Sequence, residues 1–556
     1  MDSVTVLIGG KAGFGIDKAG SIIARILSQL SYRLYIYRDY PSLIRGGHTF
    51  SLIRISSQQI ASHEEKIDFL LALDQNTLNL HSWRLKDEGA VVYDSDAVKA
   101  DGLPKGFRSL GLPIASMVKE ENVAEIMRNS CIIGIFCKAA GISIAILEEV
   151  FKKEIVKELE PNIRIAARGY QAAKEIISLQ PLGQRKLPLL TGSEALGLGL
   201  IKGGLKTYVA YPMTPSSGIL HFLAEVAQQF SLRVIHPESE IAVILMALGF
   251  SYMGERVAVG TAGGGFCLMT EGLSLAGMAE LPVVLIVGQR PGPSTGLPTY
   301  TAQTELHFVL SAGQGEFARF VVAPGDAEEA YFLSALAMNM SQRYQIPSII
   351  LSDKTLAEGV YSFNDQEIEE LPAEEPPLPS NALNYKRYLY TEDGVSPLAV
   401  LPSKNMVVKV NSYEHDEYGI TTEDPLQSKL MQEKRLRKGE SLSQALSGYR
   451  TVKVYGRRDA PITLLCWGSN KGVSVEAAER LGLRVVQPLV LAPFPSRQVL
   501  EALSGSEKII GVENNATGQL CRLMNSYGFK IDDKILKYDG RTFSVDELEG
   551  LLKKII

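Results

Sequence analysis

The chain has 556 residues and a formal net charge of −5 at pH 7, and 46% of its residues are hydrophobic and 21% charged. This length predicts about three to four packed domains, and the weakly acidic charge gives no reason to expect nucleic acid binding. No apolar run is long enough to span a bilayer, and the N-terminus enters a predicted strand directly, without the regions of a signal peptide. We therefore expect a cytoplasmic protein that does not insert into a membrane.

Residues 1–180 predict a first α/β unit. It opens with a strand in VTVLIGG, a glycine-rich turn in KAGFG and a helix in KAGSIIARILSQL. Further strands are predicted in LYIYRDY, FSLIRI, DFLLAL and AVVYD, and residues 132–155 predict a helix, a turn and a second helix. Strands that alternate with helices favour a mostly parallel sheet.

The glycine-rich turn GGKAGFG at residues 9–15 indicates a ligand with a phosphate group. Glycines after a strand let backbone amides and a helix N-terminus approach a phosphate, and Arg45, Gly46 and Gly47 of LIRGGH could face the same crevice. The spacing does not match GxGxxG, and the second strand ends in Arg38 and Asp39, so an NAD dehydrogenase is the weaker reading. A packing turn with a solvated arginine remains the structural alternative.

Residues 186–370 predict a second α/β unit. Its strands are TYVA, RVIH, RVAVGT and PVVLIVGQR, with helices from Ser216 and from 241 to 253 and a loop, AGGGF, after the third strand. The segment GLGLIKGGLKT resembles a P-loop but carries Leu205 where the lysine belongs, so we reject a Walker motif.

Two motifs of this unit place polar side chains next to predicted strand ends. In YPMTP, after the first strand, two prolines restrict the backbone on both sides of Met213, and the hydroxyl of Thr214 lies where open α/β sheets bind ligands. In HPESEIA, Glu238 and Glu240 come just before an apolar helix or in its first turn. These carboxylates either complement the helix N-terminus or face a ligand, and periodicity does not separate the two roles.

Two further motifs follow the third and fourth strands. Gly263, Gly264 and Gly265 leave the backbone bare after a strand, at an entropic cost that a purely structural turn does not require. Arg290 opens the loop QRPGPSTGLPTYTAQ, where its guanidinium and the hydroxyl of Thr295 suit a carboxylate or a phosphate.

The rest of the chain predicts a connection and a third unit. Residues 371–455 predict an extended, Pro- and Glu-rich linker followed by a helix through residues 428–456. Residues 456–556 predict a small α/β unit with strands in PITLLC, RVVQPLVL and KIIGVENN. The predicted fold class is therefore α/β, with three units and mostly parallel sheets.

Together these motifs resemble the 2-oxoacid:ferredoxin oxidoreductase family, and specifically its long alpha subunit, in which gamma and alpha parts are fused. The matching stretches are GGKAGFG, YPSLIRGGH, YPMTP, ESEIA, TAGGGFCLMTEG, GQRPGPSTGLPT, EHDEYGITTEDP and ENNATGQL. The resemblance implies a gamma-type domain at 1–180, a thiamine diphosphate pyrimidine-binding domain at 186–370 and a transketolase-like C-terminal domain at 456–556.

The resemblance also implies an activity, which is decarboxylation of a 2-oxoacid on thiamine diphosphate, transfer of the acyl group to coenzyme A and delivery of electrons to ferredoxin. Glu240, with Glu238 as the second choice, matches the glutamate that hydrogen-bonds the aminopyrimidine ring. Thr214, Arg290 and Thr295 match positions that hold the 2-oxoacid. The remaining implied cofactor contacts are Tyr211, Pro212, Gly263, Gly264 and Gly265. Coenzyme A contacts are expected at Arg45, Gly46 and Gly47.

Missing residues imply a partner chain. The GDG motif followed by two asparagines, which binds Mg²⁺ and diphosphate in thiamine enzymes, is absent, since GDAEEA at 325 lacks the second glycine and ENN at 513 is too distant. The cysteines form no CxxC pair and predict no disulfide framework, zinc site or iron–sulfur cluster on this chain: Cys131, Cys137, Cys267, Cys466 and Cys521. A beta subunit is expected to supply the diphosphate half of the site, the Mg²⁺ and a 4Fe-4S cluster.

Two alternatives stay open at this point. The substrate is expected to be 2-oxoglutarate, because the fused subunit is common among 2-oxoglutarate enzymes of the family, but pyruvate or a branched-chain 2-oxoacid fits a similar site. A non-catalytic subunit that binds a nucleotide and assembles a larger complex is the alternative from another class. That alternative predicts that replacing Arg290 or Glu240 changes stability or assembly and leaves the chemistry intact.

Overall fold

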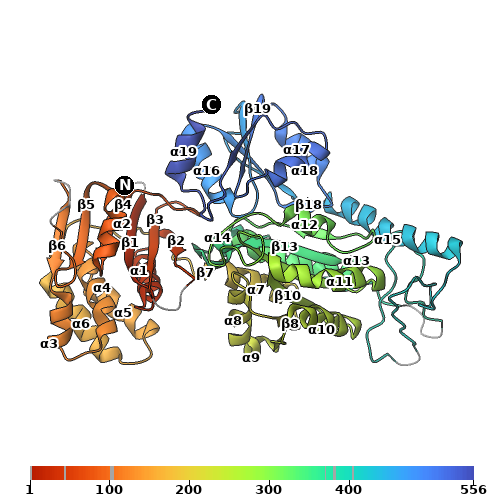
Figure 1. Ribbon diagram of the computed structural model, residues 1–556, viewed down its shortest axis with the longest axis horizontal. Coiled ribbons are helices and arrows are strands. Elements are labelled where there is room, and N and C mark those ends of the chain that lie inside the picture. Colours follow the sequence, from red (N-terminus) through yellow and green to blue (C-terminus); the bar gives the residue numbers. More distant parts are fainter. Residues whose placement is uncertain (1–2, 43–45, 101–105, 370, 380–383, 404–405) are drawn as a thin grey trace. The chain divides into compact units, whose positions relative to one another are not determined.

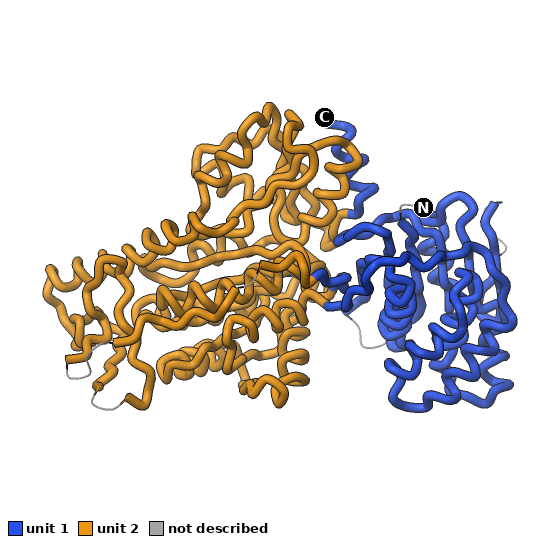
Figure 2. Tube along the Cα trace, turned by 180° about the vertical axis from the view of Figure 1, so that it is seen from behind, with its two compact units in different colours: residues 1–190, 359–364, 544–555 blue, residues 191–358, 365–543, 556 orange. Residues whose placement is uncertain are grey.

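The computed structural model describes residues 3–42, 46–100, 106–369, 371–379, 384–403 and 406–556, and these form two compact units. Unit 1 contains residues 1–190, 359–364 and 544–555, and unit 2 contains residues 191–358, 365–543 and 556 (Figures 1 and 2). None of the helices in the described part of the chain is long and apolar enough to cross a membrane.

Unit 1 is built on an eight-stranded sheet with the order β6-β5-β4-β1-β3-β2-β14-β7. The strands are β1 (Ser3–Lys11), β2 (Arg33–Asp39), β3 (His48–Ser56), β4 (Ile67–Ala72), β5 (Leu85–Asp94), β6 (Arg108–Leu112), β7 (Leu189–Thr191) and β14 (Val360–Ser362). The pairs β1–β4, β4–β5 and β5–β6 are parallel, whereas β1–β3, β2–β3 and β14–β2 are antiparallel. The sheet is mixed because the chain between β2 and β3 is too short for the crossover that parallel neighbours need.

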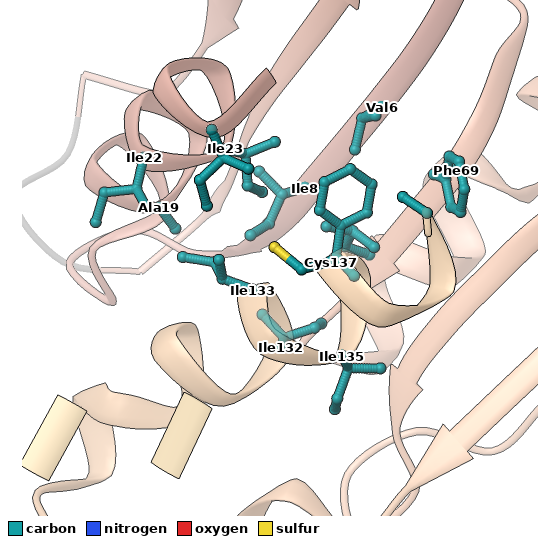
Figure 3. Close-up of a cluster of buried hydrophobic side chains, with 14 of the residues drawn as sticks. Val6, Ile8, Ala19, Ile22, Ile23, Phe69, Ile132, Ile133, Ile135 and Cys137 are labelled. Carbon is teal, nitrogen blue, oxygen red and sulfur yellow. The ribbon is translucent and has the colours of Figure 1, made fainter. Parts of the chain in front are cut away.

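The core of unit 1 lies between this sheet and its helices. The helices are α1 (Ile16–Gln29), α2 (Gln75–His81), α3 (Ile114–Glu120), α4 (Arg128–Ala139), α5 (Ile144–Glu154), α6 (Leu159–Ala172) and α19 (Val545–Leu552), with short 3-10 turns η1 (Ser82–Arg84) and η2 (Glu125–Met127). Figure 3 shows side chains of β1, α1 and α4 pointing toward one another, among them Ile8, Ile23 and Cys137, all of which are fully buried. Burial raises the pKa of the Cys137 thiol, so this cysteine acts as a small apolar side chain.

Unit 2 contains a seven-stranded sheet with the order β18-β12-β13-β11-β10-β8-β9. Its strands are β8 (Thr207–Ala210), β9 (Arg233–Ile235), β10 (Val257–Ala262), β11 (Val283–Gln289), β12 (Phe320–Val322), β13 (Pro347–Asp353) and β18 (Val490–Ala492). Every neighbouring pair is parallel except β12–β18. The helices are α7 (Gly192–Lys202), α8 (Ser217–Glu225), α9 (Ala227–Phe230), α10 (Glu240–Tyr252), α11 (Gly263–Ala279), α12 (Leu306–Ser311), α13 (Ala327–Tyr344) and α14 (Lys354–Glu358), with the 3-10 turn η3 (Asp365–Glu367).

One predicted loop of this sheet is a helix. The segment AGGGF was expected to be a loop, but Ala262 ends β10 and is also the N-cap of α11, so Gly263, Gly264 and Gly265 form the first helical turn. None of the three glycines has a positive φ. The segment GLGLIKGGLKT forms the second half of α7 and the turn into β8, which agrees with our rejection of a Walker motif there.

The third sheet, also in unit 2, has the order β15-β17-β16-β19-β20. Its strands are β15 (Val452–Gly456), β16 (Ile462–Leu465), β17 (Arg484–Pro488), β19 (Lys508–Glu513) and β20 (Asp533–Leu536), and its helices are α16 (Asn470–Leu481), α17 (Ser496–Leu503) and α18 (Gln519–Ser526). The predicted helix through 428–456 is wrong at its C-terminal end, because α15 (Pro425–Leu446) stops and residues 452–456 form β15. Gly448 follows α15, and the alternating valines of TVKVYG favour a strand.

The connection before the third sheet is held to the rest of unit 2 by a cluster of buried charges. Lys434 Nζ on α15 lies 2.8 Å from both carboxylate oxygens of Glu280, and Lys438 also pairs with Glu280. Arg387, in the connection, donates to the Glu280 carbonyl oxygen at 2.6 Å. Burial alone would raise the pKa of Glu280, but the two ammonium groups and the Arg387 guanidinium outweigh it and hold this pKa far below its usual range.

We expect the substitution Glu280→Gln to destabilise the protein by about 3–5 kcal/mol, because it leaves Lys434, Lys438 and Arg387 buried without a counter-charge. Urea unfolding of the chain measures the change. The control is Glu433→Gln on α15, the helix that also carries Lys434 and Lys438. Glu433 pairs with Lys429 at 3.6 Å at the surface, and a pair of that kind contributes at most about 1 kcal/mol. Equal losses for the two variants would contradict this account of the buried cluster.

Candidate active site

The candidate active site lies at the carboxyl ends of four neighbouring parallel strands, β9, β8, β10 and β11. The segments that follow these strands carry the four sequence motifs: HPESEIA follows β9, YPMTP follows β8, the three glycines follow β10, and Arg290 follows β11. Because parallel strands end at the same edge of a sheet, the topology brings these motifs to one edge, where open α/β folds bind ligands.

The two carboxylates of HPESEIA differ in their environment. Glu240 is the first residue of α10 and is only 7% exposed, whereas Glu238 is exposed. Ser239, between them, accepts a hydrogen bond from the Ala242 backbone N–H and caps the helix. The N-cap position is therefore filled by a serine, and the Glu240 carboxylate makes no hydrogen bond to any described residue. Glu240 is therefore a buried residue whose carboxylate oxygens are open to a ligand.

The first turn of α11 lies against Glu240. A Cβ atom on Gly265 would come within 2.2 Å of Thr261 Oγ1 and 2.8 Å of Glu240 Oε1, so only glycine fits between these groups. A Cβ atom on Gly263 would lie 2.6 Å from Glu305 Oε1. In contrast, a Cβ atom on Gly264 would have only the Ser294 carbonyl oxygen nearby, at 3.8 Å. Two of the three glycines are therefore in close contact with carboxylates of this edge, which would have to move to admit a side chain.

We expect Gly265→Ala to lower the activity of the assembled enzyme strongly, on the order of 100-fold, because the new methyl group displaces the Glu240 carboxylate. Gly264→Ala is the matched control, and its methyl group meets ordinary van der Waals contact. Dye reduction by the two purified variants measures the effect. If both variants have the activity of the unsubstituted enzyme, the position of Glu240 is not important for the reaction.

Arg290 connects two motifs of the edge. Its side chain is 8% exposed, and Nη1 donates a hydrogen bond of 2.8 Å to the Thr214 carbonyl oxygen. The Thr214 hydroxyl has no hydrogen-bond partner among the described residues. Pro215, which follows, packs on β11, because a Cβ atom on Gly288 would lie 3.0 Å from its ring. The guanidinium and the free hydroxyl are thus held by neighbouring segments.

The loop from 291 to 305 differs in detail from the prediction. Thr295 is exposed and its hydroxyl makes no hydrogen bond within the described chain. Thr299 is only 7% exposed, and its buried hydroxyl is also unpartnered there. Sequence reasoning did not select Thr299, since both residues belong to one Pro-, Gly- and Thr-rich run, and only burial separates them.

On the other side of the site, Tyr211 and Pro212 are exposed, and the Tyr211 ring meets His236 edge-on.

A second residue that sequence reasoning missed is Glu305, just before α12. Its Oε1 accepts a hydrogen bond of 2.9 Å from Thr304 Oγ1, and its Oε2 is buried without a partner in the described structure. Burial raises the pKa of this carboxyl to about 7, although Thr304 and the Arg290 guanidinium act in the opposite direction. In the sequence, nothing distinguishes Glu305 from any other acidic residue that precedes a helix.

Unit 1 contains a separate crevice at the glycine-rich turn. Ala12 N–H donates to the Gly47 carbonyl oxygen at 3.2 Å, so the turn GGKAGFG and the segment around Gly46 and Gly47 are joined directly. A hollow of about 220 Å³ lies beside the turn and is lined by residues that include Lys11, Phe14, Asp74, Arg128 and Asn129. Arg45 lies outside the described residues.

The residues at the sheet edge of unit 2 fit the pyrimidine half of thiamine diphosphate. A ring with nitrogen donors suits the buried, unbonded Glu240 carboxylate, and the first turn of α11 has no side-chain cap on its backbone amides. Within the described residues, no group of three or more His, Cys, Asp or Glu side chains is arranged to hold a metal ion. Asp326 of GDAEEA caps α13, and Asn515 of ENN accepts backbone N–H groups of residues 517–519.

Comparison with known protein families gives two matches. Residues 5–172 match the model described as pyruvate ferredoxin/flavodoxin oxidoreductase, and residues 198–435 match the model described as pyruvate flavodoxin/ferredoxin oxidoreductase, thiamine diphosphate-binding. The second match covers all four motifs of the candidate active site.

Individual relatives match over the whole chain. The chain is 32% identical to a 2-oxoacid:ferredoxin oxidoreductase subunit alpha from a Sulfolobus species, over 99% of this chain and 96% of the relative. It is 24% identical to a 2-oxoglutarate oxidoreductase subunit KorA from Mycobacterium tuberculosis, over 100% and 91%. Its structure is similar to that of 2-oxoglutarate:ferredoxin oxidoreductase from Magnetococcus marinus, solved with 2-oxoglutarate, coenzyme A and succinyl-CoA bound, with 26% identity, a TM-score of 0.91, and 100% and 99% coverage.

These matches confirm the predicted family and the predicted α/β fold class. The chain belongs to the alpha subunits of the thiamine diphosphate-dependent 2-oxoacid:ferredoxin oxidoreductases.

Proposed function

We propose that this alpha subunit acts with a beta subunit in the coenzyme A-dependent oxidative decarboxylation of a 2-oxoacid, with 2-oxoglutarate as the preferred substrate and ferredoxin as the electron acceptor. The observation that carries the proposal is that Glu240, the first turn of α11 and Arg290 meet at one sheet edge, in the region that matches the thiamine diphosphate-binding family. The preference for 2-oxoglutarate is supported by full-length similarity to the 2-oxoglutarate enzymes of Magnetococcus marinus and Mycobacterium tuberculosis.

A broader substrate range is the second candidate. The relatives from the Sulfolobus species and from Aeropyrum pernix are described as 2-oxoacid:ferredoxin oxidoreductases without a single substrate, and each is 32% identical to this chain. Pyruvate and branched-chain 2-oxoacids would share the carboxylate and keto group that Arg290 and Thr214 can bind. Discrimination then depends on the pocket for the rest of the substrate.

We assign a separate task to each residue of the site. Thiamine diphosphate, when bound, supplies the carbon nucleophile and the electron sink of the decarboxylation. Glu240 holds the pyrimidine ring through a hydrogen bond from the ring to its buried carboxylate. Arg290 binds the carboxylate of the oxoacid by charge-assisted hydrogen bonds, and the free hydroxyls of Thr214, Thr299 and the more exposed Thr295 bind its other oxygens.

The crevice of unit 1 is the proposed contact for coenzyme A. Its supporting observations are the hydrogen bond that joins the GGKAGFG turn to Gly47, and the Lys11 and Arg128 side chains that line the hollow of about 220 Å³. Glycine-rich turns before a helix bind phosphate groups, which coenzyme A carries. Arg45 belongs to the same proposal.

The beta subunit is the proposed source of what this chain does not encode. A GDG motif with two following asparagines and a cysteine cluster are both missing from the sequence, so Mg²⁺, the diphosphate and a 4Fe-4S cluster are assigned to the partner. Of the five cysteines, only Cys267 is exposed. Electrons reach ferredoxin through the partner in this proposal.

Reconstitution tests the proposal. The alpha chain and its beta subunit are purified separately and together under anaerobic conditions, and reduction of a viologen dye by 2-oxoglutarate is measured with and without coenzyme A. We expect turnover only when both chains, the oxoacid and coenzyme A are present. Full turnover by the alpha chain alone would overturn the division of the site between two chains.

A further inference from the structure

Glu305 is held rigidly next to the candidate site. Its backbone N–H donates to Gln289 Oε1 at 3.2 Å, at the end of β11. Gln519 on α18 donates to the Thr304 carbonyl oxygen at 2.7 Å and accepts from the His307 backbone N–H at 3.1 Å. The residues on both sides of Glu305 are therefore fixed by one glutamine side chain, which leaves its carboxyl group little freedom to move.

The two oxygens of this carboxyl have different environments. Oε1 accepts the hydrogen bond from Thr304 Oγ1 and lies against Gly263, where no Cβ atom would fit. Oε2 is buried and has no hydrogen-bond partner among the described residues. A buried carboxylate oxygen without a partner is costly, so its presence indicates either a proton or a ligand at that position.

Arg290 is the cation next to Glu305, because Thr304 Oγ1 donates to Glu305 Oε1 at 2.9 Å and to the Arg290 carbonyl oxygen at 3.5 Å. The guanidinium lowers the pKa of the Glu305 carboxyl against the larger effect of burial, which sets that pKa at about 7. Burial likewise lowers the pKa of Arg290, and Glu305 partly offsets this shift. The other titratable groups nearby are His307 on α12 and Glu240 on α10, while the first turn of α11 and Gln519 on α18 bring no charge.

We propose that Glu305 is a proton-accepting counter-charge for Arg290, and that Glu305 is ionised in the free enzyme only above neutral pH and is protonated from solvent when the carboxylate of a 2-oxoacid reaches Arg290. A substrate carboxylate on Arg290 would place a second negative charge near Glu305, and this like charge raises the proton affinity of Glu305. The proton has an open position on Oε2. Glu305 acts through Arg290 and is therefore a positioning residue, and this inference rests on the proposed role of Arg290 in substrate binding.

A pH dependence of substrate capture follows. The oxoacid binds the form of the free enzyme in which Glu305 is protonated, so kcat/KM decreases as the pH rises above about 7, with a limiting slope of about tenfold per pH unit. Glutamine resembles the protonated carboxyl, so Glu305→Gln removes this decrease. At about pH 8.5 the KM of the glutamine variant is then expected to be at least tenfold below that of the unsubstituted enzyme.

The test uses the complete complex with its beta subunit, saturated with coenzyme A, and measures kcat/KM for 2-oxoglutarate from about pH 6 to about pH 9. We expect a decline above neutral pH for the unsubstituted enzyme and for Glu305→Asp, and a flat profile over this range for Glu305→Gln. A glutamine variant that keeps the decline, or an unsubstituted enzyme with a flat profile, would overturn the inference.

A second measurement does not depend on the variants. Titration calorimetry of the unsubstituted complex with 2-oxoglutarate, prepared without thiamine diphosphate so that no decarboxylation follows and run in two buffers with different ionisation enthalpies, counts the protons taken up on binding. We expect uptake that approaches one proton at about pH 8.5 and becomes small at about pH 6. Binding without proton uptake at either pH contradicts the inference and leaves the proposed function intact. A complex that turns over neither 2-oxoglutarate nor pyruvate nor a branched-chain 2-oxoacid refutes both.

Discussion

Replacing Arg290 by lysine is expected to lower kcat/KM for the 2-oxoacid on the order of 100-fold. Lysine keeps the positive charge but loses the planar pair of donors that binds a carboxylate at two points. It also loses the hydrogen bond of 2.8 Å to the Thr214 carbonyl oxygen, so the segment that carries the free Thr214 hydroxyl is less well fixed. Steady-state kinetics with the assembled complex measures this change.

Arg319→Lys is the matched control for this substitution. Arg319 is half-buried, and its Nη1 donates to the carbonyl oxygens of Val309 and Ala312, each at 2.8 Å. It lies outside the candidate site, so its replacement is expected to affect stability more than kcat/KM. A loss of kcat/KM that is equal in the two variants would mean that Arg290 has a structural role only, as the non-catalytic alternative predicts.

Replacing Glu240 by glutamine is expected to lower kcat by about 100- to 10,000-fold, because in its proposed role the carboxylate accepts a hydrogen bond from the pyrimidine ring and so supports the proton transfer that the ring would carry out. The amide has nearly the shape of the carboxylate, so α10 and its Ser239 cap should form unchanged. The loss is expected at saturating 2-oxoacid and thiamine diphosphate, because the missing charge acts during the reaction. Dye reduction and the content of bound cofactor are measured on the same preparation.

Glu238→Gln is the matched control, two residues before Glu240 in the chain. Glu238 is exposed, whereas Glu240 is 7% exposed and lies against Gly265. We expect the Glu238 variant to keep nearly full activity. The opposite result, in which Glu238→Gln loses its activity and Glu240→Gln keeps it, would mean that Glu238 is the residue that holds the pyrimidine ring.

Much of this arrangement could be predicted from the sequence, because parallel strands place their C-terminal ends together. The strands TYVA, RVIH, RVAVGT and PVVLIVGQR were each recognisable by a short apolar run, and the polar residues after them therefore had to meet at one edge. The predicted α/β fold class with three mostly parallel sheets is confirmed by the fold, and the second and third sheets lie in one compact unit.

The details that could not be predicted depend on tertiary contacts. The three glycines after β10 were expected to form a loop, because glycine has a low helix propensity, but the close approach of Glu240 and Glu305 leaves no space for side chains in this helical turn. Burial separates Glu240 from Glu238 and Thr299 from Thr295, although each pair is similar in sequence. Glu305 has no local pattern that indicates its contact with Gly263.

The most direct test of the central claim is the substrate and cofactor requirement of the complex. Anaerobic viologen reduction is measured with 2-oxoglutarate, pyruvate and 2-oxoisovalerate, each with and without coenzyme A, using a complex shown to contain thiamine diphosphate and its iron–sulfur cluster. We predict reduction that needs both an oxoacid and coenzyme A, with the highest kcat/KM for 2-oxoglutarate. The absence of reduction with all three oxoacids in such a complex would contradict the account.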